Sequence, residues 1–567
     1  MQRLLSEQEI NILELNGCQA EDWTAVSVSE DFTPDYLRNV MFYGDVSLGV
    51  FERTIEVTPC FSKHSGIRNA TLRNVTIGDN CLIENIGNYI NNYTIGANCY
   101  ISNVCVMETI EGATFGQGNV VSVLNEVGEG NIMMFGLLNS QFAAFMVKHH
   151  SDHHLRDTIY RLIREEINCT MPDRGTIGER VKIVNTKEII NSVKMQDCFV
   201  GEACKISNGF TASQSIFFAN SYMSNGEACA AFCGPFTASH HKSSLLIGGQ
   251  FSFYNAGSAT NFSNHAYKMG PMHYGILERG AKTASGAYIL MPAKIGTFSV
   301  CFGKLMYHPD TRCIPFSYLI AYGDTMYLSP GRNLTTVGLY RDIRKWPKRD
   351  IRPLSKHRSI VNFDWLSPFS VNEVIQGKAI LERLREASGD NVSTYNYHMY
   401  VINAASLRMG ISHYDMALRI YMGAVVKRVL KRYGAVEPPA STIGEGAWSD
   451  LSGLLLPESE EQRLIEQIKD GTLDDVQSII DEFVAIDGRY RDYQWAWTYR
   501  LILDYYHIDH ITQADIDRIH TDYVEARRMW ISEIRKDAEK EFNMGDVERE
   551  VFDDFINLLD HEIDYEN

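Results

Sequence analysis

Residues 234–285 concentrate side chains that bind anions or transfer protons. Histidines, lysines and amides lie here among Gly, Ser and Thr, and Glu278 is the only carboxylate of the block. Cations and amide donors without a local acid favour an anionic ligand. We therefore expect a site for an anionic small molecule, and its candidate binding residues are His240, Lys242, Asn255, Asn264, Lys268, Arg279 and Lys282.

Three histidines of the same block are candidate general bases, namely His241, His265 and His273. The pKa of histidine lies near neutrality, so its imidazole can accept and return a proton at physiological pH. No motif selects among the three, and each could instead be a surface or stacking histidine with a backbone partner.

A second histidine cluster, residues 149–154, reads HHSDHH. On one helix His149 and His153 would lie four residues apart, a spacing that is compatible with a transition metal. The Glu of a His-Glu-x-x-His hydrolase motif is missing. The interpretation that we prefer is a surface helix that binds no metal.

A repeated pentad supplies the elements that must position these residues. It has an aliphatic residue, a glycine, two variable positions and a small residue. A branched aliphatic residue favours a buried strand position, and glycine permits a tight corner. The pentad begins at Ile77, Ile95, Ile177, Val200 and Ile295, and Cys81, Cys99 and Cys204 occupy its small position as packing residues.

These pentads resemble those of the hexapeptide-repeat proteins across roughly residues 51–322. The resemblance implies a left-handed parallel β-helix with three short strands and eighteen residues per coil. With eighteen residues per coil, Asn255 would stack under His273 and Asn264 under Lys282. The strings GPFTASHHKSS and PFSYLIAYGD also resemble an uncharacterised bacterial family of long hexapeptide-repeat proteins labelled sugar-1-phosphate nucleotidyltransferase-like.

The resemblance to hexapeptide acyltransferases implies a chemistry for the block. A neutral histidine would deprotonate an attacking hydroxyl or amine, and the lysines and arginine would hold the phosphates of the substrates. We expect an acyltransferase acting on a phosphorylated or nucleotide-linked sugar, with acyl-CoA as a possible co-substrate and no tightly bound cofactor. Relatives are commonly trimers, so a homo-oligomer is expected.

Two alternatives remain open. One is a non-catalytic β-helix scaffold or ligand-binding protein. The other, less favoured, is a nucleotidyltransferase-related protein without its catalytic domain, because no Gly-x-Gly-x-Arg loop follows a strand and only about 75 residues precede the first pentad.

We expect a mainly β fold with added helices, an interrupted left-handed parallel β-helix followed by an α-helical C-terminal region. The expected parts are an N-terminal segment (1–50), the β-helix (51–330) with a helical insertion near 143–168, a basic linker (331–365), a helical region (366–436) and an acidic helical bundle (440–567).

The linker carries eight Lys or Arg against two Asp over residues 341–358. The interpretation that we prefer is that this basic segment packs against the acidic bundle. The alternative is a phosphate-binding strip, with Trp346 available for stacking.

The later helices carry start signals and an aromatic stripe. Ser370 with Glu373 and Thr512 with Asp515 are expected capping boxes. The stripe around Trp495 and Trp497 favours core packing, although it could also line a cofactor pocket.

The net charge of −18 comes from one end of the chain. Residues 441–567 contain 32 acidic and 12 basic residues, and the rest of the chain is nearly neutral. The composition predicts no nucleic-acid or membrane partner. Twelve cysteines without a Cys-x-x-Cys pair, and no export signal, predict a cytoplasmic protein.

Overall fold

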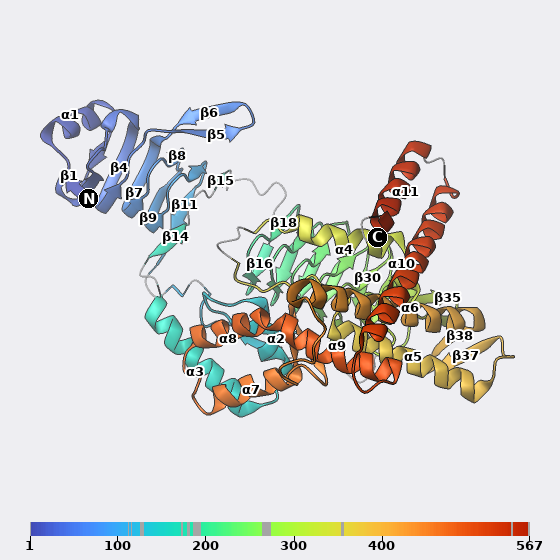
Figure 1. Ribbon diagram of the computed structural model, residues 1–567. Helices are drawn as coiled ribbons and strands as arrows, with labels where there is room; N and C mark the ends of the chain where they lie inside the picture. Colours follow the sequence, from blue (N-terminus) through green and yellow to red (C-terminus); the bar gives the residue numbers. More distant parts are fainter. Residues whose placement is uncertain are drawn as a thin grey trace. The chain divides into compact units, whose positions relative to one another are not determined.

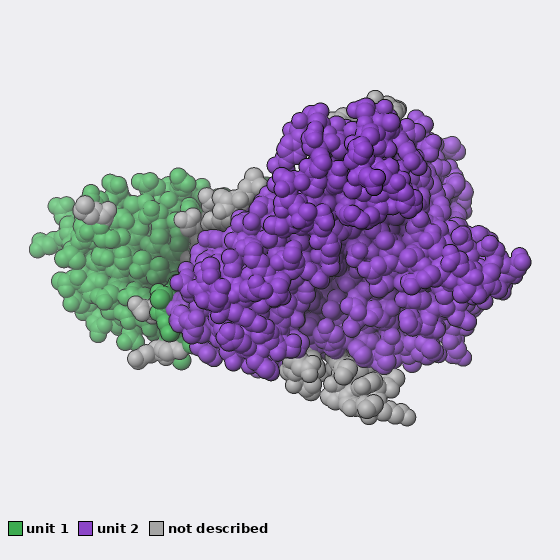
Figure 2. All heavy atoms as spheres, turned by 60° about the horizontal axis from the view of Figure 1, so that its bottom comes forward, with its two compact units in different colours: residues 1–117, 167–191 green, residues 118–166, 192–567 purple. Residues whose placement is uncertain are grey.

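The computed structural model describes residues 2–110, 113–114, 116–124, 130–171, 174–177, 182–184, 194–263, 274–352, 357–545 and 548–564. The chain divides into two compact units (Figure 2). Unit 1 consists of residues 1–117 and 167–191, and unit 2 of residues 118–166 and 192–567.

Unit 1 stacks parallel strands on one another. Leu48, Ile77, Ile95 and Ile177 pair in register across this sheet. A Cβ at Gly78 would lie 2.7 Å from the Ala97 nitrogen, so only glycine fits between the layers. The principal strands are β3 (Val26–Ser29), β4 (Leu37–Leu48), β7 (Gly66–Ile77), β8 (Leu82–Glu84), β9 (Tyr89–Ile95), β10 (Tyr100–Ser102), β14 (Gly175–Ile177) and β15 (Lys182–Val184).

In unit 2 the chain passes through three sheets in turn, so that every third strand joins the same sheet. We call residues 194–322 the coiled region. The first sheet contains β16 (Lys194–Gln196), β19 (Thr211–Ser213), β22 (Glu227–Cys229), β25 (Leu245–Ile247), β28 (Asn261–Ser263), β31 (Tyr288–Leu290) and β34 (Lys304–Leu305). The second contains β17 (Phe199–Val200), β20 (Ile216–Phe217), β23 (Phe232–Cys233), β26 (Gln250–Phe251), β29 (Gly275–Leu277) and β32 (Ala293–Ile295).

The third sheet carries the candidate site. Its parallel strands are β18 (Lys205–Ser207), β21 (Tyr222–Ser224), β24 (Ala238–Ser239), β27 (Asn255–Ala256), β30 (Lys282–Thr283), β33 (Val300–Phe302) and β35 (Tyr318–Tyr322). The sheet continues through β36 (Thr325–Ser329), β38 (Tyr400–Asn403) and β37 (Thr394–Tyr397). The predicted combination of parallel strands with a helical C-terminal region is confirmed (Figure 1).

The expected register within the site block is wrong. Glu227 pairs with Leu245 at a spacing of eighteen residues, but Asn255 pairs with Lys282, twenty-seven residues later. This turn of the coil contains about half as many residues again as the others. A constant period of eighteen residues therefore assigns the wrong partner strand to every residue after this point.

The insertion expected near 143–168 consists of two helices, α2 (Ser140–Lys148) and α3 (His153–Thr170). Where a linker was expected, residues 337–349 instead form helix α4 (Val337–Arg349). The Thr336 side chain caps this helix by accepting the Leu339 N–H at 3.2 Å. The dense charge and Pro347, a residue that usually interrupts a helix, concealed the helix in the sequence.

The remaining helices are α5 (Pro368–Ser388), α6 (Ala404–Tyr433), α7 (Glu458–Lys469), α8 (Val476–Gly488), α9 (Tyr490–Tyr506), α10 (Gln513–Phe542) and α11 (Arg549–Asp564). None of the helices in the described part of the chain is long and apolar enough to cross a membrane. The capping box of Thr512 and Asp515 is confirmed. The box expected at Ser370 is wrong, because Ser367 caps α5.

Glu373 is therefore not a capping residue. It is buried against the coiled region, where Thr297 Oγ1 donates to its Oε2 at 2.7 Å. Burial raises the pKa of Glu278 to about 7, and burial together with the Glu278 carboxyl raises the pKa of Glu373. Two carboxyl groups in one apolar environment disfavour double ionisation. Arg312 partly offsets this for Glu278, whereas Asp450 adds to it.

We predict that stability falls as pH rises, because groups with raised pKa values bind more protons in the folded state. The fall begins near the ordinary carboxyl pKa of about 4.5 and continues through the folded pKa of about 7 of Glu278. Urea unfolding at pH 5 and pH 8 should differ by on the order of 2 kcal/mol through this pair. Glu373→Gln should reduce this difference and stabilise the protein at pH 8. An unchanged pH dependence in Glu373→Gln would contradict the assignment.

Candidate functional site

A cavity of about 500 Å³ lies between the third sheet of the coiled region and helix α4. We call it the basic pocket. One column of paired residues, Lys205, Tyr222, Ala238, Asn255 and Lys282, lines it from the sheet. Consecutive members lie about 4.8 Å apart, the spacing of paired strands. The column presents a lysine at each end, with an aromatic ring, a small residue and an amide between them.

Helix α4 supplies further cations to the basic pocket. Arg341, Lys345, Lys348 and Arg349 line it, and their spacing of three and four residues places them on one face of the helix. Burial and the neighbouring Arg349 lower the pKa of Lys345. The helix thus lowers the cost of bringing an anion into the pocket.

The charges of the basic pocket are not balanced. Asp342 is the one acidic side chain among its described lining residues, and it pairs with Lys282 across the pocket. No ion pair within the described part of the chain engages Lys205, Lys345, Lys348 or Arg349. This surplus of positive charge is suited to an anionic ligand.

Aromatic packing holds α4 over the sheet. The Trp346 ring lies 5.0 Å from that of Phe253 and 6.1 Å from that of Phe298. At the start of the helix, Asp537 accepts the Val337 N–H at 3.1 Å. Trp346 thus packs α4 against the sheet and also lines the basic pocket.

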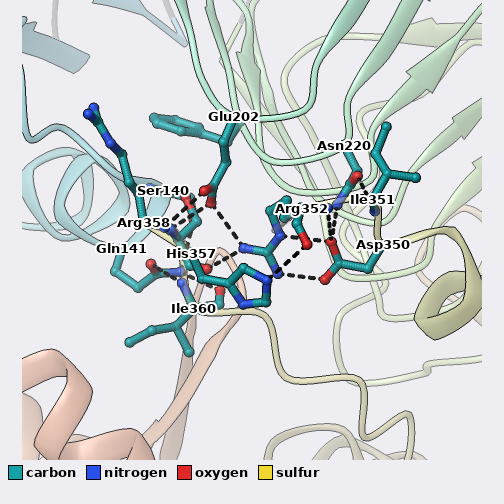
Figure 3. Close-up of polar contacts among 12 residues, drawn as sticks. Ser140, Gln141, Glu202, Asn220, Asp350, Ile351, Arg352, His357, Arg358 and Ile360 are labelled. Carbon is teal, nitrogen blue, oxygen red and sulfur yellow. Dashed lines mark hydrogen bonds and ion pairs between the residues drawn. The ribbon is translucent and has the colours of Figure 1, made fainter. Parts of the chain in front are cut away.

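A buried charge network fixes the chain beyond α4 to the coiled region (Figure 3). Arg352 donates to Glu202 at 3.0 Å and to both oxygens of Asp350 at 2.9 and 2.8 Å. Asn220 also donates to Asp350, at 2.9 Å. Although burial opposes it, Arg352 and Asn220 lower the pKa of Asp350 to about 2. Asn220 and Ile351 also line the pocket, so this network sets one wall of it.

His240 is the described histidine that lines the basic pocket. Its ring stacks on Tyr222 with centroids 5.0 Å apart and an angle of 4°. Burial lowers its pKa, as do the neighbouring His241, Lys345 and Arg349. Its buried Nδ1 has no hydrogen-bond partner among the described residues. The lowered pKa favours the neutral form of the imidazole.

The structure brings together three of the predicted site residues, His240, Asn255 and Lys282. His241 is exposed and does not line the basic pocket, although its ring is 4.3 Å from that of His240. Lys242 is exposed and lines a separate open hollow. The predicted site residues Asn264, His265, Lys268 and His273 lie outside the described residues.

Arg279 has a structural role. Its side chain is 2% exposed, and its Nε donates to Asp450 at 2.8 Å. Its Nη1 donates to the Asn362 carbonyl at 2.5 Å, and its guanidinium lies 4.6 Å from the Phe253 ring centre. These contacts join the coiled region to strand β39 (Trp448–Leu451) and to the segment that precedes α5, and they leave Arg279 outside the basic pocket.

Sequence reasoning missed the contribution of α4. The signal was present, because the eight cations of residues 341–358 suggested a phosphate-binding strip as an alternative. Lys345, Lys348 and Arg349 line the basic pocket, while the start of the same helix contacts α10 through Asp537. Lys205 and Tyr222 lie too early in the sequence for any local pattern to group them with Lys282.

The His149–His154 cluster does not lie on one helix. His149 ends α2 and His153 begins α3. His149 Nε2 and Lys148 Nζ each lie 2.7 Å from a carboxylate oxygen of Glu461. Burial opposes ionisation, yet these two partners lower the pKa of Glu461 to about 2. His149 thus fastens the insertion to α7, and the described residues include no cluster suited to a metal.

Two family matches cover most of the chain. Residues 2–195 and 187–385 match the family described as Domain of unknown function (DUF4954). Residues 434–549 match the family described as Domain of unknown function (DUF6819). No curated protein matches this sequence. The first family takes in the coiled region and α4, so it contains every described residue of the basic pocket.

We predict that Arg279→Met destabilises the protein by about 3–5 kcal/mol, because it leaves the Asp450 carboxylate buried and unpaired. Lys242→Met, at an exposed position of the same block, should change the free energy of unfolding by less than about 0.5 kcal/mol. Urea unfolding at pH 7 measures both. Equal effects of the two substitutions would contradict a structural role for Arg279.

Proposed function

The chain belongs to the family described as Domain of unknown function (DUF4954), and on that premise we propose that it is an acyltransferase-type enzyme that binds a phosphorylated or nucleotide-linked sugar in the basic pocket. We further propose that its coiled region is a left-handed parallel β-helix of the hexapeptide-repeat class. The recurring pentads support this assignment.

The surplus of cations in the basic pocket carries the proposal. Lys205, Lys345, Lys348 and Arg349 surround about 500 Å³ of space without a carboxylate partner among the described residues. Phosphate groups supply several anionic oxygens that accept charge-assisted hydrogen bonds from such side chains. A volume of this size falls within the range of small-molecule sites.

His240 is the proposed general base, in place of His241. Its neutral imidazole takes a proton from the acceptor hydroxyl, whose oxygen bonds to the carbonyl carbon of the acyl-CoA thioester. The carbon–sulfur bond then breaks, and the departing thiolate receives the proton from the imidazolium. The lowered pKa of His240 supports this role, because a histidine already protonated at pH 7 could not act as a base.

The proposal extends to assembly and location. By the same resemblance the chain forms a homo-oligomer, with a trimer favoured, and light scattering of the purified protein measures this. A cytoplasmic location is supported by the absence of disulfides among the twelve cysteines, all of which lie in the described part of the chain.

We predict that the double variant Lys345→Ala/Lys348→Ala binds UDP-N-acetylglucosamine and acetyl-CoA at least about tenfold more weakly than wild type. Each change removes a partner of a phosphate group, and tenfold corresponds to about 1.4 kcal/mol. Lys242→Ala, which leaves the basic pocket intact, is the matched control. Isothermal titration calorimetry measures the affinities, and equal weakening by the control would contradict the assigned pocket.

A second experiment tests the catalytic step. His240→Gln should lower CoA release from acetyl-CoA in the presence of a sugar nucleotide by about 100-fold or more, while binding persists. His241→Gln is the neighbouring control and should leave turnover near wild type. Binding without turnover in the wild-type protein would favour the non-catalytic ligand-binding alternative, and no binding of either probe would refute the proposal.

A further inference from the structure

The C-terminal region contains a second cavity, of about 570 Å³. It lies between the end of α6, the start of α9 and the connecting segment 435–443. The segment and α9, but not the end of α6, fall within the part of the chain that matches Domain of unknown function (DUF6819). We call it the apolar cavity. It shares no described lining residue with the basic pocket.

Three tryptophan indoles hold the segment that covers this cavity. The Nε1 of Trp495 donates to the Glu437 carbonyl at 3.0 Å, and that of Trp448 donates to the Gly444 carbonyl at 2.7 Å. Two residues further along the chain, the Gly446 carbonyl accepts a hydrogen bond from Trp497 Nε1 at 3.1 Å. The segment is thus anchored at both ends, and the cavity exists before any ligand binds.

A glycine brings the segment close to α9. Gly444 has a φ of 117°, and a Cβ at this position would lie 2.4 Å from the Tyr493 carbonyl oxygen. Only glycine fits this conformation and this contact. Because the cavity is preformed, the protein loses little conformational entropy when a ligand binds.

The walls of the cavity are largely rings. Tyr433, Tyr493 and Trp495 face it from the two helices, and Pro438 and Pro439 face it from the covering segment. Prolines have no backbone N–H, so this wall presents few donors that a ligand would have to satisfy. Such flat apolar walls favour a ligand that stacks on the rings and displaces water from the cavity.

Two of the three charged lining residues of the cavity are paired with neighbours. Arg489 pairs with Glu482 at 2.9 Å, and Asp492 pairs with Arg432 at 3.3 Å. The third charged lining residue, Glu437, is exposed to solvent. Unlike the basic pocket, this cavity has no surplus of cations that would attract a phosphate.

We propose that the apolar cavity is a binding site for an uncharged small molecule with a flat aromatic ring system. The aromatic stripe of α9 then has two roles, since Trp495 anchors the covering segment through its N–H and lines the cavity with its ring. Burial of the ligand's apolar surface supplies the affinity.

N-phenyl-1-naphthylamine tests the proposal, because it is uncharged and its fluorescence increases in apolar surroundings. The full chain should bind it at one site, and Ala440→Phe, which fills the cavity from the covering segment, should weaken that binding at least tenfold. Ala379→Phe is the matched control, an exposed alanine of α5 that lines neither cavity. Ser441→Phe serves as a second filling variant if Ala440→Phe fails to fold.

The sulfonated analogue 1-anilinonaphthalene-8-sulfonate tests the charge requirement on the same skeleton. Its binding should be unaffected by Ala440→Phe, because a sulfonate is excluded from this cavity. Equal affinity of N-phenyl-1-naphthylamine for the wild-type protein and a folded cavity-filling variant would overturn the proposal. So would a sulfonated probe that binds as tightly as the uncharged probe and is displaced by the filling substitution.

Discussion

The in-register pairing of parallel strands is the constraint on which the other features depend. Because each strand of the coiled region hydrogen-bonds to the strand one turn away, residues of equivalent position form columns that run across the turns. On the third sheet of the coiled region, such a column aligns Lys205 with Lys282, which are 77 positions apart in the sequence. Helix α4 needs only to lie across this column to enclose the basic pocket. The chemistry of the site thus arises from the pairing geometry and not from a local motif.

Buried charges then join later segments of the chain to this scaffold. Arg279 reaches Asp450 and Arg352 reaches Glu202, while a third pair, His149 with Glu461, joins the end of α2 to α7. Removing a charge from water is expensive, so a buried ion pair by itself adds little net stability. A buried pair instead contributes specificity. Any other packing would leave one of the two charges buried without its partner. The pair of Glu278 and Glu373 differs, because it is most favourable when the two carboxyl groups retain at least one proton.

The sequence could predict what recurs at short range. The pentads identified the paired aliphatic positions of Ile77 and Ile95, and Thr512 identified the start of a helix. It could not predict the long turn between Asn255 and Lys282, because no local signal states where a strand re-enters the sheet. Arg279 was misassigned as a ligand-binding residue for a similar reason: its partner lies 171 residues away. Lys345 was seen as part of a cationic run, but only the capped helix α4 shows which face of that run meets the sheet.

The long turn has a consequence for the modular design of the protein. After the extra residues between Ser263 and Gly275, all three sheets resume their pairing, as Asn261 with Tyr288, Gln250 with Ile276 and Asn255 with Lys282 show. The strands on either side therefore impose no fixed length on the chain that connects them. The pairing of the strands, and not the number of residues in a turn, therefore sets the register of the three sheets.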